Sequence, residues 1–166
     1  MGKKRSELTA NYPLRTMTID PGFGGTGWAY WLGNAYPIYG VIKEKAGIKK
    51  GTDEIRITLM VREFRNILKY YQPTRVVLES MQLWQSLMSQ TSAARGDLFL
   101  LQTLVGAYAS TCIFQDIEFE FRTPTQWKGQ LSKEALRARI SMINACRYPD
   151  HAEDAVGIGF HLAGIL

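Results

Sequence analysis

Residues 52–79 constrain the fold more than any other part of the chain. Apolar residues recur there at a helical spacing, and Pro73 ends the pattern. Residues 76–78 (Val-Val-Leu) then form an apolar run typical of a buried strand, and Glu79 follows where such a strand emerges from a sheet. The helical stripe consists of Ile57, Met60, Phe64, Ile67, Leu68 and Tyr71. A helix followed by a buried strand indicates an α/β fold.

The remaining elements complete a mixed sheet. Strands are expected at residues 16–20, 26–32 and 38–43, separated by turns rich in glycine, asparagine and proline. A long apolar helix is expected over residues 96–114, followed by a short strand in which Ile117, Phe119 and Phe121 alternate. Ser132 caps a helix of about fifteen residues, and Asp150 begins the last helix. This order predicts an α/β fold with a mixed five-stranded sheet flanked by helices.

The composition favours one domain with a polyanionic partner. At 166 residues the chain suits a single domain over residues 16–166, preceded by a basic tail over residues 1–15. Its formal net charge of +5 favours a nucleic acid over an acidic small molecule. The two cysteines, Cys112 and Cys146, are expected to be reduced. With no apolar run of eighteen residues and no signal peptide, we expect no membrane contact and a cytoplasmic location.

Two acids stand at strand ends. Asp20 is followed by Pro21 and by four glycines between positions 22 and 27, so the strand ends there and leaves the carboxylate at its edge. Glu79 ends the buried strand in the same way. Open α/β folds keep their sites at the carboxyl ends of strands, and hard divalent cations prefer oxygen ligands. Asp20 and Glu79 are therefore candidate metal ligands.

The last helix carries two kinds of polar residue. His151 and Asp154 are three positions apart, so they share one helical face, as a common metal site requires. Asp150-x-x-Glu153 has the form of a capping box, in which each side chain satisfies a backbone amide of the first turn. We therefore expect Asp150 and Glu153 to be structural, with Asp150 as a reserve ligand candidate.

Five short motifs occur in a fixed order along the chain. They are Ile19-Asp20-Pro21-Gly22 with Thr26-Gly27-Trp28-Ala29, Leu78-Glu79-Ser80, Ala94-Arg95-Gly96, Pro124-Thr125-Gln126-Trp127-Lys128-Gly129 with Lys133, and the terminal His151-x-x-Asp154-Ala155. This order resembles that of the RuvC family of Holliday junction resolvases, within the wider RNase H-like nuclease superfamily. The resemblance spans roughly residues 16 to 165 and implies an RNase H-like fold. Its departures suit a phage or divergent prokaryotic member.

The resemblance also implies an activity. It identifies Asp20, Glu79, His151 and Asp154 as the catalytic and metal-binding set, with Asp20 as the ligand shared by two Mg²⁺ ions per site and Mn²⁺ as an alternative ion. The expected reaction is resolution of four-way DNA junctions by paired nicks that leave 5′ phosphate ends. A homodimer is the expected assembly, and the helix over residues 96–114 is apolar on more than one side, as a second packing partner would require.

Further residues are expected to contact DNA. These are Lys128, Lys133, Arg95, Arg122 and Trp84. The two lysines lie where the family carries DNA-contacting or catalytic lysines, and solvated lysines flanking a turn are the simpler interpretation. The family places an aromatic wedge after the position of Glu79; here Leu83 or Trp84 would take that role, with a dimer contact as the alternative for Trp84.

Three other functions remain to be weighed. A nuclease of the same fold with a broader range of branched DNA substrates is the nearest. A nucleotide-binding module of the actin and Hsp70 type also has an acid and a glycine-rich turn after its first strand, but it needs two such domains. A non-catalytic nucleic-acid binder would have no need of all four site residues.

Overall fold

The computed structural model describes residues 14–33, 36–43, 52–80 and 96–166. Trp84, Leu83 and Arg95 lie outside these ranges. The elements are β1 (Leu14–Asp20), β2 (Thr26–Leu32), β3 (Ile38–Ile42), α1 (Asp53–Tyr71), β4 (Arg75–Glu79), α3 (Asp97–Ile113), β5 (Glu118–Arg122), α4 (Pro124–Trp127), α5 (Lys133–Ile143) and α6 (Asp150–Leu162). The predicted order of strands and long helices is confirmed. Strand β1 begins at Leu14, two residues inside the segment assigned to the tail.

The five strands form one mixed sheet in the order β3-β2-β1-β4-β5. Strands β1, β2 and β3 form an antiparallel meander, whereas β4 is parallel to β1 and β5 is parallel to β4. The helices α1 and α3 supply the long connections that parallel strands require. The prediction of a mixed five-stranded sheet flanked by helices is therefore confirmed.

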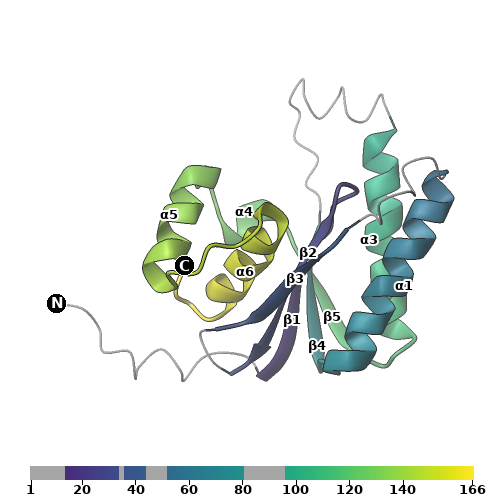
Figure 1. Ribbon diagram of the computed structural model, residues 1–166, viewed down its shortest axis with the longest axis horizontal. Coiled ribbons are helices and arrows are strands. Elements are labelled where there is room, and N and C mark those ends of the chain that lie inside the picture. The colour runs from purple at the N-terminus through teal and green to yellow at the C-terminus, as the bar shows by residue number, and fades with distance from the viewer. Residues whose placement is uncertain (1–13, 34–35, 44–51, 81–95) are drawn as a thin grey trace.

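Helices cover both faces of the sheet. Figure 1 shows α1 and α3 on one face and α4, α5 and α6 on the other. Because side chains alternate along a strand, the central strands contribute side chains to two cores, one on each face of the sheet. Ile19 and Leu78 belong to the core beneath α1 and α3. Ala29 and Val77 belong to the core beneath α6. Glu79 comes two positions after Val77 and therefore lies on the same face of the sheet, toward α6.

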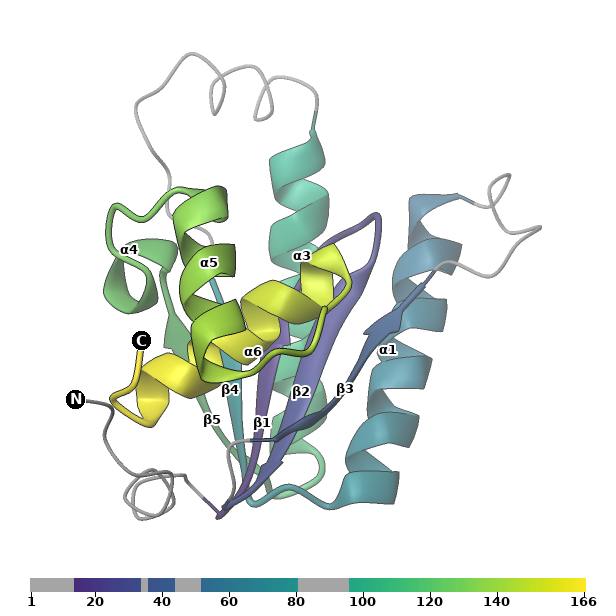
Figure 2. The same cartoon turned by 60° about the vertical axis from the view of Figure 1, so that its left-hand side comes forward.

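Helix α6 crosses the sheet at close range, as Figure 2 shows. A Cβ atom on Gly159 would lie 2.0 Å from the Trp31 ring, and one on Gly27 of β2 would lie 1.9 Å from the carbonyl oxygen of His151. Neither position has room for a side chain. Small residues therefore let α6 approach the sheet closely, and Gly27 brings the first turn of α6 onto the start of β2.

Element boundaries follow local signals, with one addition. The Ser132 hydroxyl accepts from the Ala135 amide (3.2 Å), which confirms the predicted cap of α5, although α5 has 11 residues. The short helix α4 was not expected. Its capping box joins Thr123 and Gln126, whose side-chain Oε1 accepts from the Thr123 amide (2.8 Å). Among the described residues, no helix is long and apolar enough to cross a membrane.

Candidate active site

Asp20 and Glu79 lie side by side at the carboxyl ends of the neighbouring central strands β1 and β4. Strands β1 and β4 are parallel, with Ile19 beside Leu78, so the next residue of each strand comes to the same end. Both acids face α6. The Thr18 hydroxyl, two residues before Asp20, donates to the carbonyl oxygen of Ala155 in that helix (2.7 Å). The sheet therefore presents two neighbouring carboxylates to the first turns of α6.

The glycine-rich turn after Asp20 surrounds the imidazole of His151. A Cβ atom on Gly25 would lie 3.2 Å from His151 Cδ2, and one on Gly22 would lie 3.4 Å from Cε1. The Gly25 amide donates to the Gly22 carbonyl (3.2 Å), which closes the turn. Beyond ending the strand, these glycines make room for a side chain that arrives from the opposite end of the sequence.

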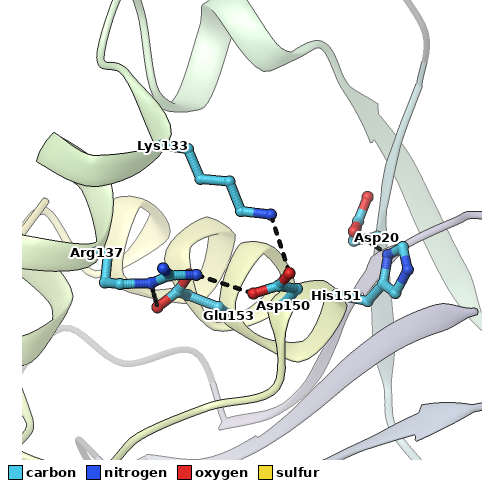
Figure 3. Close-up of polar contacts among 6 residues, drawn as sticks. All are labelled: Asp20, Lys133, Arg137, Asp150, His151 and Glu153. Atoms are coloured by element: carbon cyan, nitrogen blue, oxygen red, sulfur yellow. Dashed lines mark hydrogen bonds and ion pairs between the residues drawn. The ribbon is translucent and has the colours of Figure 1, made fainter.

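His151 contacts Asp20. Its Nδ1 atom lies 3.5 Å from Asp20 Oδ2, and 45% of the His151 side chain is exposed against 14% of that of Asp20. Hydrogen bonding to Asp20 raises the pKa of His151, with desolvation opposing it and the charges of Asp20 and Asp154 adding to it. The predicted pairing of His151 with the acids is thus present in space, as Figure 3 shows for His151 and Asp20.

Glu79 is held by a residue that the sequence analysis did not identify. The indole Nε1 of Trp127 donates to Glu79 Oε2 (2.9 Å). Burial, reinforced by the charge of Asp20, raises the pKa of Glu79 to about 7, against the opposing effects of Lys128 and this hydrogen bond. Glu79 is therefore an acid that holds its proton near neutral pH unless a cation compensates its charge.

Asp154 completes a cluster of carboxylates. Desolvation, followed by the charge of Asp20, raises its pKa, while Lys128 and Lys133 act in the opposite direction. Its Oδ1 atom is buried and has no hydrogen-bond partner in the part of the chain that the structure describes. A buried carboxylate oxygen without a partner is costly, and a bound cation would compensate it.

Within the described ranges, no three His, Cys, Asp or Glu side chains already lie close enough to hold a metal ion. One carboxylate oxygen of Glu79 accepts from Trp127, and one of Asp20 lies near His151. The donor set nevertheless fits a hard divalent cation, because the three carboxylates lie near one another and the charge of Asp20 raises the pKa of both Glu79 and Asp154. Small side-chain rotations would have to accompany ion binding.

The predicted capping box at the start of α6 is wrong. Helix α6 begins after Pro149 without a side-chain cap. Instead, Arg137 of α5 binds both acids: its Nε lies 3.1 Å from each carboxylate oxygen of Glu153, and its Nη2 lies 2.8 Å from Asp150 Oδ1. Figure 3 shows this fork, with Lys133 approaching Asp150 (3.5 Å). The two acids are structural because they tie α6 to α5, since a bidentate guanidinium satisfies a buried carboxylate better than a backbone amide does.

Three of the residues expected to contact DNA lie within the described ranges: Lys128, Lys133 and Arg122. Lys128 and Lys133 lie near enough to the site to lower the pKa of Asp154. Arg122 ends β5 beside Glu79 in register, and its Nε donates to Glu120 Oε1 (3.0 Å). Sequence analysis missed Trp127, although the Thr123-x-x-Gln126 pattern signals a short helix that ends at that residue. It also missed Arg137, for which no local signal exists.

Comparisons with known proteins agree with this architecture. No protein-family model matches the sequence, and no curated protein sequence matches it. Among solved structures, Thermus thermophilus RuvC in complex with a Holliday junction substrate matches with a TM-score of 0.69 at 17% identity, covering 88% of this chain and 90% of that chain. A second Thermus thermophilus RuvC structure gives a TM-score of 0.67 at 17% identity, covering 88% and 91%.

A eukaryotic resolvase also matches. The yeast mitochondrial Holliday junction resolvase Ydc2 gives a TM-score of 0.56 at 15% identity, covering 98% of this chain and 86% of that chain. The class defined by the sheet order and the helix layers is the RNase H-like α/β fold. Within that class, the chain has the fold of the RuvC-type resolvases over most of its length.

Proposed function

We propose that this protein is a structure-selective endodeoxyribonuclease that resolves Holliday junctions by paired, Mg²⁺-dependent nicks. The observation that carries the proposal is the grouping of Asp20 and Glu79, at the carboxyl ends of β1 and β4, with Asp154 of α6, where Glu79 and Asp154 each have a raised pKa. Groups with perturbed pKa values cluster at functional sites, and carboxylate oxygens are the ligands with which metal-dependent nucleases hold Mg²⁺.

Asp20, Glu79, Asp154 and His151 would hold the ions, with Asp20 as the shared ligand because it touches His151 and acts electrostatically on the other two acids. Bound divalent ions supply an activated water and neutralise charge on the scissile phosphate. His151, where it is not a ligand, would accept a proton from that water. Lys128 lies on the same side of the site and would offset negative charge on the phosphate.

The junction substrate and the homodimer rest on the fold and on an exposed apolar surface. Of the proteins with a similar structure, RuvC is bound to a Holliday junction substrate and Ydc2 is a Holliday junction resolvase. On α3, the Phe99 side chain is 74% exposed, and Ile113 and Phe114 at the other end are also largely exposed. This is the surplus apolar surface that a second subunit would cover. A two-fold dimer would face a nearly two-fold symmetric junction with two sites.

A labelled synthetic four-way junction tests the proposal. With Mg²⁺, and not with Ca²⁺, we expect symmetric nicks in opposite strands that leave 5′ phosphate ends. Asp20→Asn should bind the junction and fail to cut it, because the amide keeps the shape and loses the charge that holds the ion. Cutting by Asp20→Asn near the wild-type rate, or equal cutting of linear duplex, would contradict the proposal.

A broader branched-DNA nuclease is the second candidate. The observation in its favour is the divergence of the chain, which is 17% identical to RuvC over 88% of its length. Three-way junctions and forks in the same assay separate the two functions. Comparable rates on all branched substrates would favour the broader enzyme, and a strong preference for the four-way junction would favour the resolvase.

A further inference from the structure

Trp127 is a buried aromatic residue with its one polar atom directed into the candidate site. Only 3% of its surface is exposed, and it belongs to the core beneath α6 together with Leu136 and Ile140. Its Nε1 atom donates to Glu79 Oε2 at 2.9 Å, across 48 residues of sequence. An indole has only this one donor, so the ring can serve only one acceptor.

Helix α6 leaves a gap that the ring fills. A Cβ atom on Gly157 would lie 2.6 Å from Cζ3 of Trp127 and 3.1 Å from Cη2, so no larger residue fits there without moving the indole. The capped helix α4 fixes the backbone at the other side, since Trp127 is its last residue. The indole is therefore held by two elements, and its N–H direction is set by packing.

The same ring also carries a cation. Lys128 Nζ lies 4.9 Å from the centroid of the Trp127 ring, within the range of a cation–π contact. Lys128 in turn lowers the pKa of both Glu79 and Asp154. The Trp127 side chain thus contacts the Glu79 carboxylate through its indole N–H and the Lys128 ammonium group through the face of its ring.

We propose that Trp127 is a positioning residue for Glu79: its buried N–H fixes Oε2 and so orients the carboxylate toward the ion-binding position that Asp20 and Asp154 share. This inference rests on the proposed metal-dependent nuclease function. Among the described residues, the other oxygen of Glu79 has no hydrogen-bond partner and is left for the ion. Partners that orient a metal ligand commonly change metal affinity or activity by about 10- to 100-fold when they are removed.

Trp31 provides a matched control. It is fully buried in the same core, and its Nε1 donates to Thr18 Oγ1 at 3.1 Å, so it too makes one buried indole hydrogen bond. It touches none of the four proposed ligands through that bond. Loss of core packing should therefore affect Trp31→Phe and Trp127→Phe alike, whereas loss of ligand orientation should affect only the latter.

The first measurement needs no activity. The protein has four tryptophans, so a proton–nitrogen NMR spectrum should contain four indole resonances. The Trp127 resonance is the one absent from Trp127→Phe, or the one broadened by a spin label if that variant fails to fold. We expect Glu79→Ala to move the Trp127 resonance upfield and leave that of Trp31 in place. An unmoved Trp127 resonance would overturn the inference.

The second measurement is calorimetric titration of the metal-free protein with MnCl₂, without DNA. Trp127→Phe should weaken Mn²⁺ binding by about 10- to 100-fold, and Trp31→Phe by less than about 3-fold. Junction cutting should follow the same order, with the loss in Trp127→Phe partly recovered at high Mg²⁺, while junction binding in Ca²⁺ stays unchanged. Equal effects of the two variants would reduce Trp127 to a packing residue and overturn the inference.

The two proposals fail in different ways. If the wild-type protein binds Mn²⁺ but cuts no branched DNA, the proposed function is wrong, and the NMR and Mn²⁺ comparisons still decide the role of Trp127. If the wild-type protein cuts and Trp127→Phe binds Mn²⁺ and cuts like wild type, the function stands and the role of Trp127 is refuted.

Discussion

At the scale of single residues, the site is governed by the cost of holding three carboxylates together without a counter-ion. Burial raises the pKa of Glu79 to about 7 and also raises that of Asp154, and the charge of Asp20 contributes to both shifts. The pKa of His151 is raised as well, chiefly by its hydrogen bond to Asp20. Folding therefore favours the protonated form of all three groups, and metal binding must displace those protons.

This predicts a pH-dependent stability of the metal-free protein. Because the folded Glu79 binds its proton more tightly than the unfolded chain does, its contribution is fully present below pH 4.5 and is lost as pH rises through about 7. The shifts of Asp154 and His151 have the same sign. We expect the free energy of unfolding to fall between pH 5 and 8, by on the order of 3 kcal/mol from Glu79.

Denaturant unfolding at several pH values measures this dependence. Glu79→Gln should flatten the profile, and saturating Mg²⁺ should raise stability more at pH 8 than at pH 6, since the ion competes with protons. A profile of Glu79→Gln identical to that of wild type would contradict the assignment of the shift to Glu79.

A second prediction separates ligands from structural acids. Asp154→Asn removes one of the clustered negative charges, so the metal-free variant should melt no lower than wild type and yet cut junctions at least about 100-fold more slowly. Asp150→Ala is the control, because Asp150 is exposed and paired with Arg137 and Lys133. If Asp150→Ala abolished cutting in a folded protein while Asp154→Asn remained active, the ligand on α6 would have been assigned wrongly.

At the scale of elements, the site depends on how α6 is anchored. Its first turn is placed on the sheet by Gly27 and is tied to α5 by Arg137. Glu153 is almost fully buried, with 5% of its side chain exposed, and its carboxylate is paired with that guanidinium. The acids next to the proposed ligands thus hold the helix in place, while His151 and Asp154 face the strand ends.

The Arg137–Glu153 pair predicts a non-additive mutant cycle. Arg137→Met leaves a buried carboxylate without a partner and should lower the melting temperature markedly. The double variant Arg137→Met with Glu153→Met removes both charges and should melt higher than Arg137→Met alone, because it leaves no unpaired carboxylate buried at this position. Thermal melts at pH 7 provide the measurement. Additive losses in the double variant would show that the two residues act independently.

At the scale of the whole molecule, the candidate site at the carboxyl ends of β1 and β4 is separate from the exposed apolar surface on α3. A single site can make one nick, whereas resolution of a junction needs two symmetric nicks. The exposed Phe99 on α3 is part of the surplus apolar surface that we assign to a second subunit.

Phe99→Glu should therefore shift the protein toward the monomer. We expect sedimentation to show a dimer for wild type and a monomer for the variant, because a charge is costly to bury in an apolar contact between subunits. Cutting should change from paired to single nicks. Met142→Glu is the control, since Met142 is 87% exposed on α5. A wild-type monomer that still makes paired nicks would refute the assembly.

The sequence by itself determined the order of the strands and long helices and pointed to three candidate carboxylates. Periodicity marked α1 and α3, Pro73 and Ser132 marked helix boundaries, and Asp20 and Glu79 stood at strand ends because turn chemistry is local. It also set Asp150 and Glu153 apart from Asp154 as structural acids, although the capping box that it gave as the reason was wrong.

Only the tertiary structure decided which distant side chains meet. Trp127 reaches Glu79 across 48 residues, and Arg137 reaches Glu153 across 16. The pattern Asp150-x-x-Glu153 satisfies a capping box locally, yet a guanidinium from α5 offers these carboxylates a stronger partner. Such contacts arise when helices pack on a common sheet, and no periodicity along one segment encodes them. The raised pKa of Glu79 belongs to the same class, because burial and neighbouring charge are properties of the folded molecule.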